Sequence, residues 1–269
     1  MLAFVVHAAT RLSDVTGLAS TGVVAIIPAR YSSTRFPGKP LADIGGRPMV
    51  EHVYRRAAAA TSIETVVVAT DDSRVAQAVT KFGGLVQMSR PDHVSGTDRL
   101  AEVAEALRCE LVVNVQVDEP LINPTAIDAA VASCADNASV VMSTLRCPLQ
   151  RAADLHDPNI VKVAVDRNGY ALCFSRAAIG LGRTGDRSPS ASPVDKHIGL
   201  YVYRRPFLLT LGRLDPTPLE LAEQLEQMRV LEHGHRIMTT ATNHDSVAVD
   251  TPAELEHVRR LVADGASYE

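Results

Sequence analysis

Short β-branched runs alternate with helix-like stretches along the first half of the chain. The runs VVAIIP (23–28), TVVVAT (65–70) and LVVNVQ (111–116) are separated by helix-like stretches of ten or more residues, such as RPMVEHVYRRAAAA (47–60). This alternation is typical of βαβ units, whose strands lie parallel and are covered by helices on both faces. It predicts an α/β fold with a doubly wound, mainly parallel sheet.

Further along the chain, two strand-like runs have the spacing of a hairpin. NIVKVAV (159–165) and YALCFS (170–175) are separated by the short sequence DRNG. Asn168 and Gly169 readily take the positive φ angles that a tight turn needs. A small antiparallel element is therefore expected to interrupt the parallel sheet.

One amphipathic helix is predicted at residues 218–234. It begins with a proline, carries Leu221, Leu225 and Met228 at helical spacing, and ends at Gly234. Packing against the protein core accounts for these apolar positions without a partner molecule.

The domain organisation is expected to be simple. Residues 1–21 hold an apolar stretch with no basic segment ahead of it, which argues against a signal peptide and for a disordered extension. Residues 22–269 are expected to form a single domain with an inserted lobe at about 160–205. Residues 180–195 are rich in Gly, Ser and Pro and are predicted to form a loop.

Composition limits the possible partners and the compartment. A net charge of −4 gives no global field that would attract nucleic acid or an anionic membrane, so a polyanionic ligand must be held by local charge. No apolar run approaches the roughly 20 residues that span a bilayer. The four cysteines lie far apart without a disulfide pattern, which favours a reducing compartment such as the cytoplasm: Cys109, Cys134, Cys147 and Cys173.

The segment IIPARYSSTRFPGKPL (26–41) carries the strongest indication of a ligand. A buried strand ends here in a loop that holds Arg30, Arg35 and Lys39. Ligands of open parallel sheets bind at the carboxyl ends of strands, and three cations at such an end can hold a triphosphate. The spacing matches neither a Walker A loop nor a GxGxxG fingerprint. A solvated basic loop is the alternative.

Carboxylates follow a later strand in VVNVQVDEPLI (112–122). Asp118 is the first candidate for a Mg²⁺ ligand, because magnesium prefers oxygen ligands and bridges carboxylates to phosphates. Asp250, at an expected strand end before a helix that starts at Thr251, would supply the second carboxylate. The alternatives are that Asp118 and Glu119 only cap the next helix and that Asp250 is an ordinary cap.

The loop HVSGTDRL (93–100) precedes another helix. Ser95, Gly96 and Thr97 could present amides and hydroxyls to the edge of a base. The same residues fit an ordinary helix N-cap equally well.

Taken together, these segments resemble the 3-deoxy-manno-octulosonate (Kdo) cytidylyltransferases, also called CMP-Kdo synthetases. The resemblance runs from about Val23 to the C-terminus. Its motifs occur in the family order: IIPARYSSTRFPGKPLADIGGRPM, HVSGTDRLAEV, VNVQVDEPLI, PNIVKV, FSRA, HIGLYVY, LEQMRVL and VDTPAELE.

The resemblance implies a Rossmann-like nucleotidyltransferase fold, a frequent homodimer, and transfer of CMP from CTP to a small acidic acceptor with Mg²⁺. It implies catalytic roles for Arg30, Arg35, Lys39 and Asp118, with Asp118 and Asp250 as metal ligands. The implied nucleotide-binding residues are Ala29, Arg30, Lys39, Ser95, Gly96, Thr97 and Gln116. The implied acceptor-binding positions are Gln116, Val117, Arg183, His197, Tyr201, Val202, Glu226 and Gln227.

Three departures from the family pattern concern the acceptor. Val117 and Val202 each stand where the family has a glycine, and the usual proline and aromatic residue before Arg183 are missing. If both valines faced the acceptor, they would narrow its site and favour a smaller acid, such as a phosphonate of natural-product biosynthesis. If they pack against neighbouring side chains, Kdo still fits, and the pathway is that of lipopolysaccharide.

Two other classes stay open at this point. A CTP-binding pseudoenzyme is suggested by Val117 beside Asp118. A sugar-1-phosphate nucleotidyltransferase that uses UTP or GTP is disfavoured, because such enzymes usually open with a glycine-rich loop in place of PARYSSTRFPGK (28–39).

Overall fold

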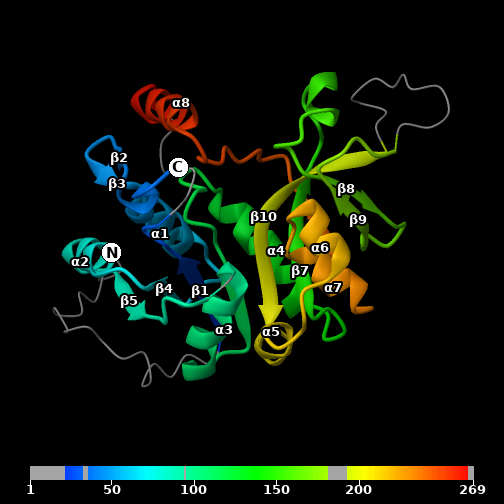
Figure 1. Cartoon of the computed structure of the whole chain (residues 1–269), viewed down its shortest axis with the longest axis horizontal. Coiled ribbons are helices and arrows are strands. Elements are labelled where there is room, and N and C mark those ends of the chain that lie inside the picture. Colours follow the sequence, from blue (N-terminus) through cyan, green and yellow to red (C-terminus); the bar gives the residue numbers. More distant parts are fainter. Residues whose placement is uncertain (1–21, 33–35, 94, 181–192, 266–269) are drawn as a thin grey trace.

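A nine-stranded mixed sheet organises the part of the chain that the computed structural model describes, which comprises residues 22–32, 36–93, 95–180 and 193–265 (Figure 1). Its main path has the strand order β11-β7-β10-β6-β1-β4-β5, with β8 joined to β10 and β9 joined to β8. A separate two-stranded sheet pairs β2 with β3. The strands are β1 (Val23–Pro28), β2 (Asp43–Ile44), β3 (Arg47–Pro48), β4 (Thr65–Thr70), β5 (Leu85–Met88), β6 (Leu111–Asn114), β7 (Met142–Cys147), β8 (Lys162–Val165), β9 (Ala171–Ser175), β10 (Val194–Arg204) and β11 (Met238–Ala241).

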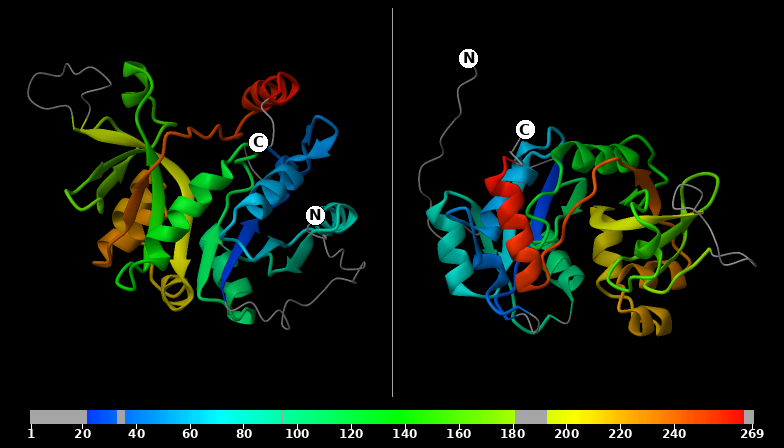
Figure 2. Two further views of the ribbon diagram at one scale, coloured as in Figure 1. Left: turned by 180° about the vertical axis from the view of Figure 1, so that it is seen from behind. Right: turned by 90° about the horizontal axis from the view of Figure 1, so that it is seen from above.

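Helices cover both faces of this sheet, as the views in Figure 2 show. On β1, Ala25 and Ile27 belong to one apolar cluster and Val24 and Ile26 to the other, and all four are fully buried. The first cluster includes side chains of α1, α2 and α4, and the second those of α3, α5 and α7. The helices are α1 (Met49–Ala59), α2 (Ser73–Lys81), α3 (Gly96–Ala106), α4 (Pro124–Ala135), α5 (Arg205–Leu211), α6 (Pro218–Glu223), α7 (Gln227–Glu232) and α8 (Pro252–Ala263), with 3₁₀ turns η1 (Lys39–Leu41) and η2 (Ala152–Leu155).

The prediction of a doubly wound, mainly parallel sheet is confirmed for the first half of the molecule. Strands β6, β1, β4 and β5 pair in parallel, with Ile26 opposite Val67 and Asn114. Strand β6 ends two residues before the end predicted from the sequence, so Gln116 lies in the following loop. The carboxyl ends of β1 and β6 therefore lie side by side and present both of the predicted phosphate and metal loops at one edge.

The second half contains the expected antiparallel element. Strand β10 runs antiparallel to β6, β7 and β8, and β8 forms a hairpin with β9. At the hairpin turn Gly169 has a φ of 84°, whereas Asn168 does not enter the left-handed region, so glycine alone provides the positive angle. Strand β10 begins at Val194, so the last two residues of the predicted loop 180–195 belong to the strand. Residues 181–192 of that loop lie outside the described residues.

The prediction of one continuous helix at 218–234 is wrong. The segment forms α6 and α7, and Gln224 between them has a φ of 53°, a left-handed conformation that ends the first helix. As a result Leu221 does not pack in the core and is 67% exposed, while Leu225 and Met228 are buried. The break also places Glu226 and Gln227 at the start of a separate short helix.

The remaining expectations concern the ends of the chain and the cysteines. The extension predicted at residues 1–21 lies outside the described residues. None of the described helices is long and apolar enough to cross a membrane. All four cysteines are free thiols, and Cys134 and Cys147 are buried in the core.

Candidate active site

The loop after β1 places Lys39 by means of a glycine turn. Gly38 adopts a φ of 76° at the N-cap of η1 and donates its N–H to the carbonyl of Tyr31 at 2.8 Å. A side chain at this position would be strained, because L-residues rarely occupy that region. The turn folds the loop back so that Lys39, the first residue of η1, is buried with only 9% of its surface exposed.

The Lys39 ammonium lies between the two predicted metal carboxylates. Its Nζ is 2.7 Å from Asp118 Oδ2 and 3.0 Å from Asp250 Oδ1. Burial by itself would lower the pKa of Lys39, but the charges and hydrogen bonds of Asp118 and Asp250 raise that pKa above its ordinary value. Lys39 is therefore cationic, and the structure brings together three residues that lie up to 211 positions apart in the sequence.

Asp250 reaches this place on an extended segment between β11 and α8, which crosses from one half of the molecule to the other (Figure 1). The expectation that Asp250 ends a strand is wrong, because residues 242–251 contain no strand. Instead the Val249 N–H donates to the carbonyl of Asp118 at 2.8 Å and aligns the two chain segments. The predicted helix start is correct: Thr251 and Glu254 form a capping box at the start of α8.

The alternative that Asp118 and Glu119 cap the following helix is wrong. The N-cap of α4 is Asn123, whose side chain accepts a hydrogen bond from the Thr125 N–H at 2.8 Å. Asp118 is left to face Lys39, and its side chain is 25% exposed.

A divalent cation fits the chemistry of this pair of carboxylates. Asp118 and Asp250 already share one cation, the ammonium of Lys39, which shows that a positive charge can contact both at once. Two carboxylate oxygens together with phosphate oxygens form the type of ligand set that Mg²⁺ takes in nucleotide sites. The donor set therefore suits magnesium.

The loop before α3 lies against the end of β1. Gly96 is the first residue of α3, and a Cβ built on it would meet Pro28 Cγ of β1 at 3.9 Å. Arg30 donates from Nη2 to the carbonyl of His93 and, at 3.3 Å, to that of Ser95. Ser95 forms a capping box with Asp98, so the N-cap interpretation of this motif is correct for the Ser95 side chain.

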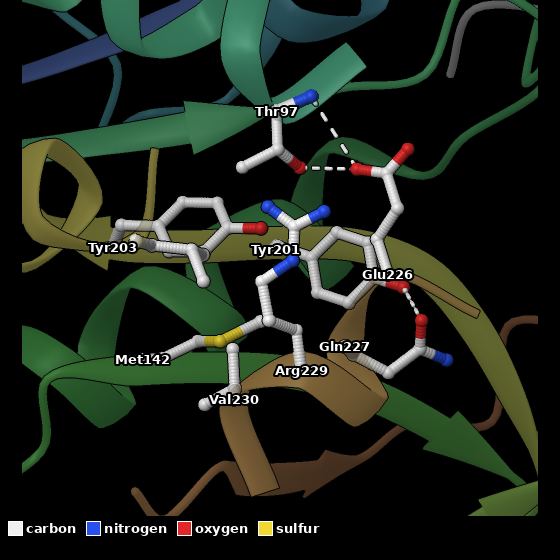
Figure 3. A pocket seen from close by; sticks show the side chains of 9 residues that line it. Thr97, Met142, Tyr201, Tyr203, Glu226, Gln227, Arg229 and Val230 are labelled. Atoms are coloured by element: carbon white, nitrogen blue, oxygen red, sulfur yellow. Dashed lines mark hydrogen bonds between the residues drawn. The ribbon is translucent and has the colours of Figure 1, made fainter. Parts of the chain in front are cut away.

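Thr97, in the first turn of α3, contacts a residue that was assigned to the acceptor. Its hydroxyl donates to the Glu226 carboxylate, and its N–H lies 3.4 Å from the same oxygen, Glu226 Oε2. Figure 3 shows these groups around a small cavity of about 10 Å³, with Tyr201 and Gln227 in its wall.

A larger cavity of about 490 Å³ lies beside the carboxylates, and Glu119, the neighbour of Asp118, is in its wall. This volume is in the range of small-molecule sites, roughly 300–1,000 Å³. Three of the positions assigned to the acceptor line it: His197, Tyr201 and Gln227. Tyr201 donates its hydroxyl to Gln227 Oε1 at 3.0 Å, and the buried Gln227 Nε2 has no hydrogen-bond partner within the described residues.

His197 presents a neutral ring to this cavity. The Thr144 hydroxyl lies 2.7 Å from the carbonyl of Leu200, to which it donates its hydrogen. It can therefore only accept from His197 Nε2, 2.9 Å away, which leaves Nδ1 as an acceptor. Burial lowers the pKa of His197 to about 3, so the ring is uncharged at neutral pH.

Several ionisable residues of the cavity wall were not assigned to the site from the sequence, among them Lys196 and Glu119. Lys196 precedes His197 on β10 and donates to Asp245 Oδ1 at 2.6 Å. Glu119 is buried and accepts a hydrogen bond from the Ser246 hydroxyl; burial, followed by the charge of Asp118, raises its pKa to about 7. Both residues directly adjoin residues that were singled out, and that adjacency is the signal that could have found them.

The two valines that replace family glycines do not line the cavity. Val202 is fully buried and Val117 is 8% exposed, and both belong to the apolar cluster beneath α1, α2 and α4. Residues alternate along β10, so Val202 points away from the face that carries Tyr201. These buried positions support the interpretation that both valines pack against neighbouring side chains.

Four of the other assigned positions do not line this cavity within the described residues. Ala29 is fully buried and uses its N–H for the carbonyl of Ala69, so it offers no surface to a nucleotide. Gln116 is not in the cavity wall, but its Nε2 donates to Asn114 Oδ1 at 3.1 Å at the end of β6. Arg35 and Arg183 lie outside the described residues.

Comparison with known proteins agrees with this geometry. The family model for cytidylyltransferases matches residues 24–237. The 3-deoxy-manno-octulosonate cytidylyltransferase of Geobacter sulfurreducens is 54% identical over 88% of this chain and 97% of its own length. That of Syntrophotalea carbinolica is 52% identical over 88% of this chain and 96% of its own length.

Solved structures give the same result. A structure of CMP:2-keto-3-deoxy-manno-octonic acid synthetase complexed with CTP superimposes with a TM-score of 0.85 at 42% identity, covering 91% of this chain and 99% of that one. A cytidylyltransferase from Leptospira borgpetersenii, at 18% identity and a TM-score of 0.62, shares the fold. The chain is a CTP-dependent nucleotidyltransferase that belongs to the cytidylyltransferase family and, within it, to the 3-deoxy-manno-octulosonate cytidylyltransferases.

Proposed function

We propose that this protein transfers CMP from CTP to Kdo and releases pyrophosphate, with Mg²⁺ as the metal. The observation that carries the proposal is the cluster in which Lys39 contacts Asp118 and Asp250, directly beside a cavity lined by His197 and Tyr201. A charged phosphate site and a polar cavity for an acceptor adjoin there. The relatives named for this reaction match this chain along nearly their whole length.

In the proposed reaction a hydroxyl oxygen of the acceptor forms a bond to the α-phosphorus of CTP and loses its proton to solvent. The bond from that phosphorus to the bridging oxygen breaks, and pyrophosphate leaves. Positioning and neutralisation of charge supply most of the catalysis in such transfers. Lys39, Arg30 and Arg35 would hold the charge of the leaving pyrophosphate.

Asp118 and Asp250 would hold the magnesium ion. When bound, the ion would supply positive charge to the triphosphate oxygens. The base of CTP would lie at the loop of Ser95, Gly96 and Thr97, next to the end of β1.

The acceptor would occupy the cavity of about 490 Å³. The neutral His197, through Nδ1, and Gln227, through its free Nε2, offer one acceptor and one donor to a polyhydroxylated acid. The buried positions of Val117 and Val202 support an acceptor of ordinary family size over a small phosphonate. Arg183 would add a cation for the acid group.

We also infer that residues 22–269 act as one catalytic unit, with residues 160–205 as an inserted lobe, and that two copies form a homodimer. Within the described residues β9 pairs with one strand only, β8, and its Leu172 is 64% exposed. Leu219 and Leu221 on α6 are also exposed, and α6 is tied to β9 through Glu223, which accepts from the Ser175 hydroxyl at 2.7 Å. A second copy could cover these apolar residues.

The free thiols are consistent with the reducing cytoplasm.

Pyrophosphate release tests the proposed function. Purified protein is incubated with CTP and Mg²⁺ and with Kdo, a small phosphonate or no acceptor, and UTP and GTP replace CTP in parallel. We expect pyrophosphate release only in the reaction that combines CTP with Kdo, and in none of the other combinations of nucleotide and acceptor. Release with the phosphonate and not with Kdo would refute the assigned acceptor while leaving the cytidylyl transfer intact.

A further inference from the structure

The first turn of α7 contacts both the nucleotide loop and the acceptor cavity. Glu226, at the N-cap of α7, accepts hydrogen bonds from the hydroxyl and the N–H of Thr97. The next residue, Gln227, accepts from the Tyr201 hydroxyl in the cavity wall. In Figure 3 the Glu226 carboxylate lies beside Thr97, and the Gln227 amide lies beside the Tyr201 hydroxyl.

A second residue of α7, Arg229, also contacts the segment around Ser95 and Thr97. Arg229 Nη1 lies 4.0 Å from Asp98 Oδ1, and Asp98 is the capping-box partner of Ser95. The Arg229 guanidinium is itself fixed by two bonds to the buried Glu220 carboxylate, at 2.8 and 2.6 Å. The first turn of α3 therefore contacts α7 through the hydrogen bonds of Thr97 and the longer ion pair of Asp98, while Arg30 donates to the carbonyl of Ser95 just before this turn.

The contact to Thr97 conflicts with a fixed role of Glu226 in the acceptor site. Its carboxylate uses the hydroxyl and amide of Thr97, which are among the groups that a base at this loop would approach. A base that takes these donors leaves the Glu226 carboxylate to find new partners. Because consecutive Cα atoms are only about 3.8 Å apart, a movement of the Glu226 backbone would also shift Gln227 and its bond to Tyr201.

We propose that Glu226 is a positioning residue that couples the two substrate sites: it binds Thr97 while the nucleotide site is empty, and its release by the nucleotide rearranges Gln227 and Tyr201 for the acceptor. The inference rests on the proposed function, because it assigns CTP to the loop and Kdo to the cavity. Coupling between two sites is typically about 5- to 150-fold in affinity, and it is reciprocal.

The experiment measures the affinity for Kdo with and without a nucleotide that cannot react. The probe is α,β-methylene-CTP with Mg²⁺, whose carbon bridge prevents transfer of CMP. Isothermal titration calorimetry gives the dissociation constant for Kdo in each state, and the ratio of the two constants is the coupling factor. The variants are Thr97→Val, Glu226→Ala and their combination, with Thr97→Ser as the rescue and Thr80→Val as the matched control. The Thr80 hydroxyl donates to Ala76 within α2, away from both sites.

In the wild type we expect the nucleotide to tighten Kdo binding by about 5- to 150-fold. Thr97→Val and Glu226→Ala should each bring the factor close to 1, and the double variant should lower it no further. Thr97→Ser and Thr80→Val should retain the wild-type factor. If Glu226→Ala fails to fold, Glu226→Gln replaces it, since the amide keeps one acceptor and should lower the factor partially.

Two results would overturn the coupling role. One is a wild-type factor of 1. The other is an unchanged factor in Thr97→Val, since Thr97 would then not act on the acceptor through Glu226. Absence of pyrophosphate release from CTP and Kdo in the wild type would instead refute the proposed function, so the two failures are distinguishable.

Discussion

The neutral, buried His197 should make the stability of the protein fall in mild acid. Its pKa is lowered to about 3 by burial, compared with about 6.5 in an unfolded chain. Between these values the unfolded state binds a proton that the folded state does not, so the free energy of unfolding decreases as the pH falls. From pH 7.5 to pH 5 this single group removes about 2 kcal/mol of stability.

The replacement His197→Gln isolates this contribution. Glutamine keeps a donor near the Thr144 hydroxyl and cannot titrate, although it loses the ring contacts to Phe174 and Tyr201, whose centroids are 4.8 and 5.5 Å away. The variant should be less stable than the wild type at pH 7.5, and its further loss between pH 7.5 and pH 5 should be smaller by about 2 kcal/mol.

Urea unfolding of both proteins at the two pH values provides the measurement. Proton uptake by other groups, such as Glu119, occurs in both proteins and cancels in the difference between them to the extent that their environments are unchanged. An identical loss of stability in both proteins would refute the reasoning, because it would mean that His197 is protonated in the folded state or reaches solvent.

Three further predictions concern the metal site and the valines. Val202→Gly should lower the free energy of unfolding by about 3 kcal/mol, from lost burial and added chain entropy, and should leave the KM for the acceptor unchanged; a lower acceptor KM would restore the narrowed-site hypothesis. Lys39→Met should bind Mn²⁺ without nucleotide more tightly than the wild type, because the ammonium no longer occupies the space between Asp118 and Asp250; equal affinities in electron paramagnetic resonance titrations would contradict this. Chelation by EDTA should abolish pyrophosphate release and added Mg²⁺ should restore it, with Asp250→Asn requiring more Mg²⁺ for half-maximal rate; a Mg²⁺ requirement equal to the wild type would exclude Asp250 as a ligand.

The sequence alone determined the layers of the fold and the loops that carry charge. Runs such as residues 23–28 are apolar on both faces, and a strand of this kind is stable only between two layers of helices. Residues that follow such a strand lie at one edge of the sheet, which is why the sequence by itself places Lys39 and Asp118 in one site.

Only the tertiary structure decided which way individual side chains face and which distant residues meet. A β-strand alternates its faces, so the direction of Val202 depends on the register of β10 against β6 and β7, which is a non-local property. The break between α6 and α7 depends on the left-handed Gln224, which helical periodicity does not reveal. The positions of Asp250 and Glu226 depend on contacts across 211 and 129 residues of sequence, because local patterns carry no information about which segments fold against each other.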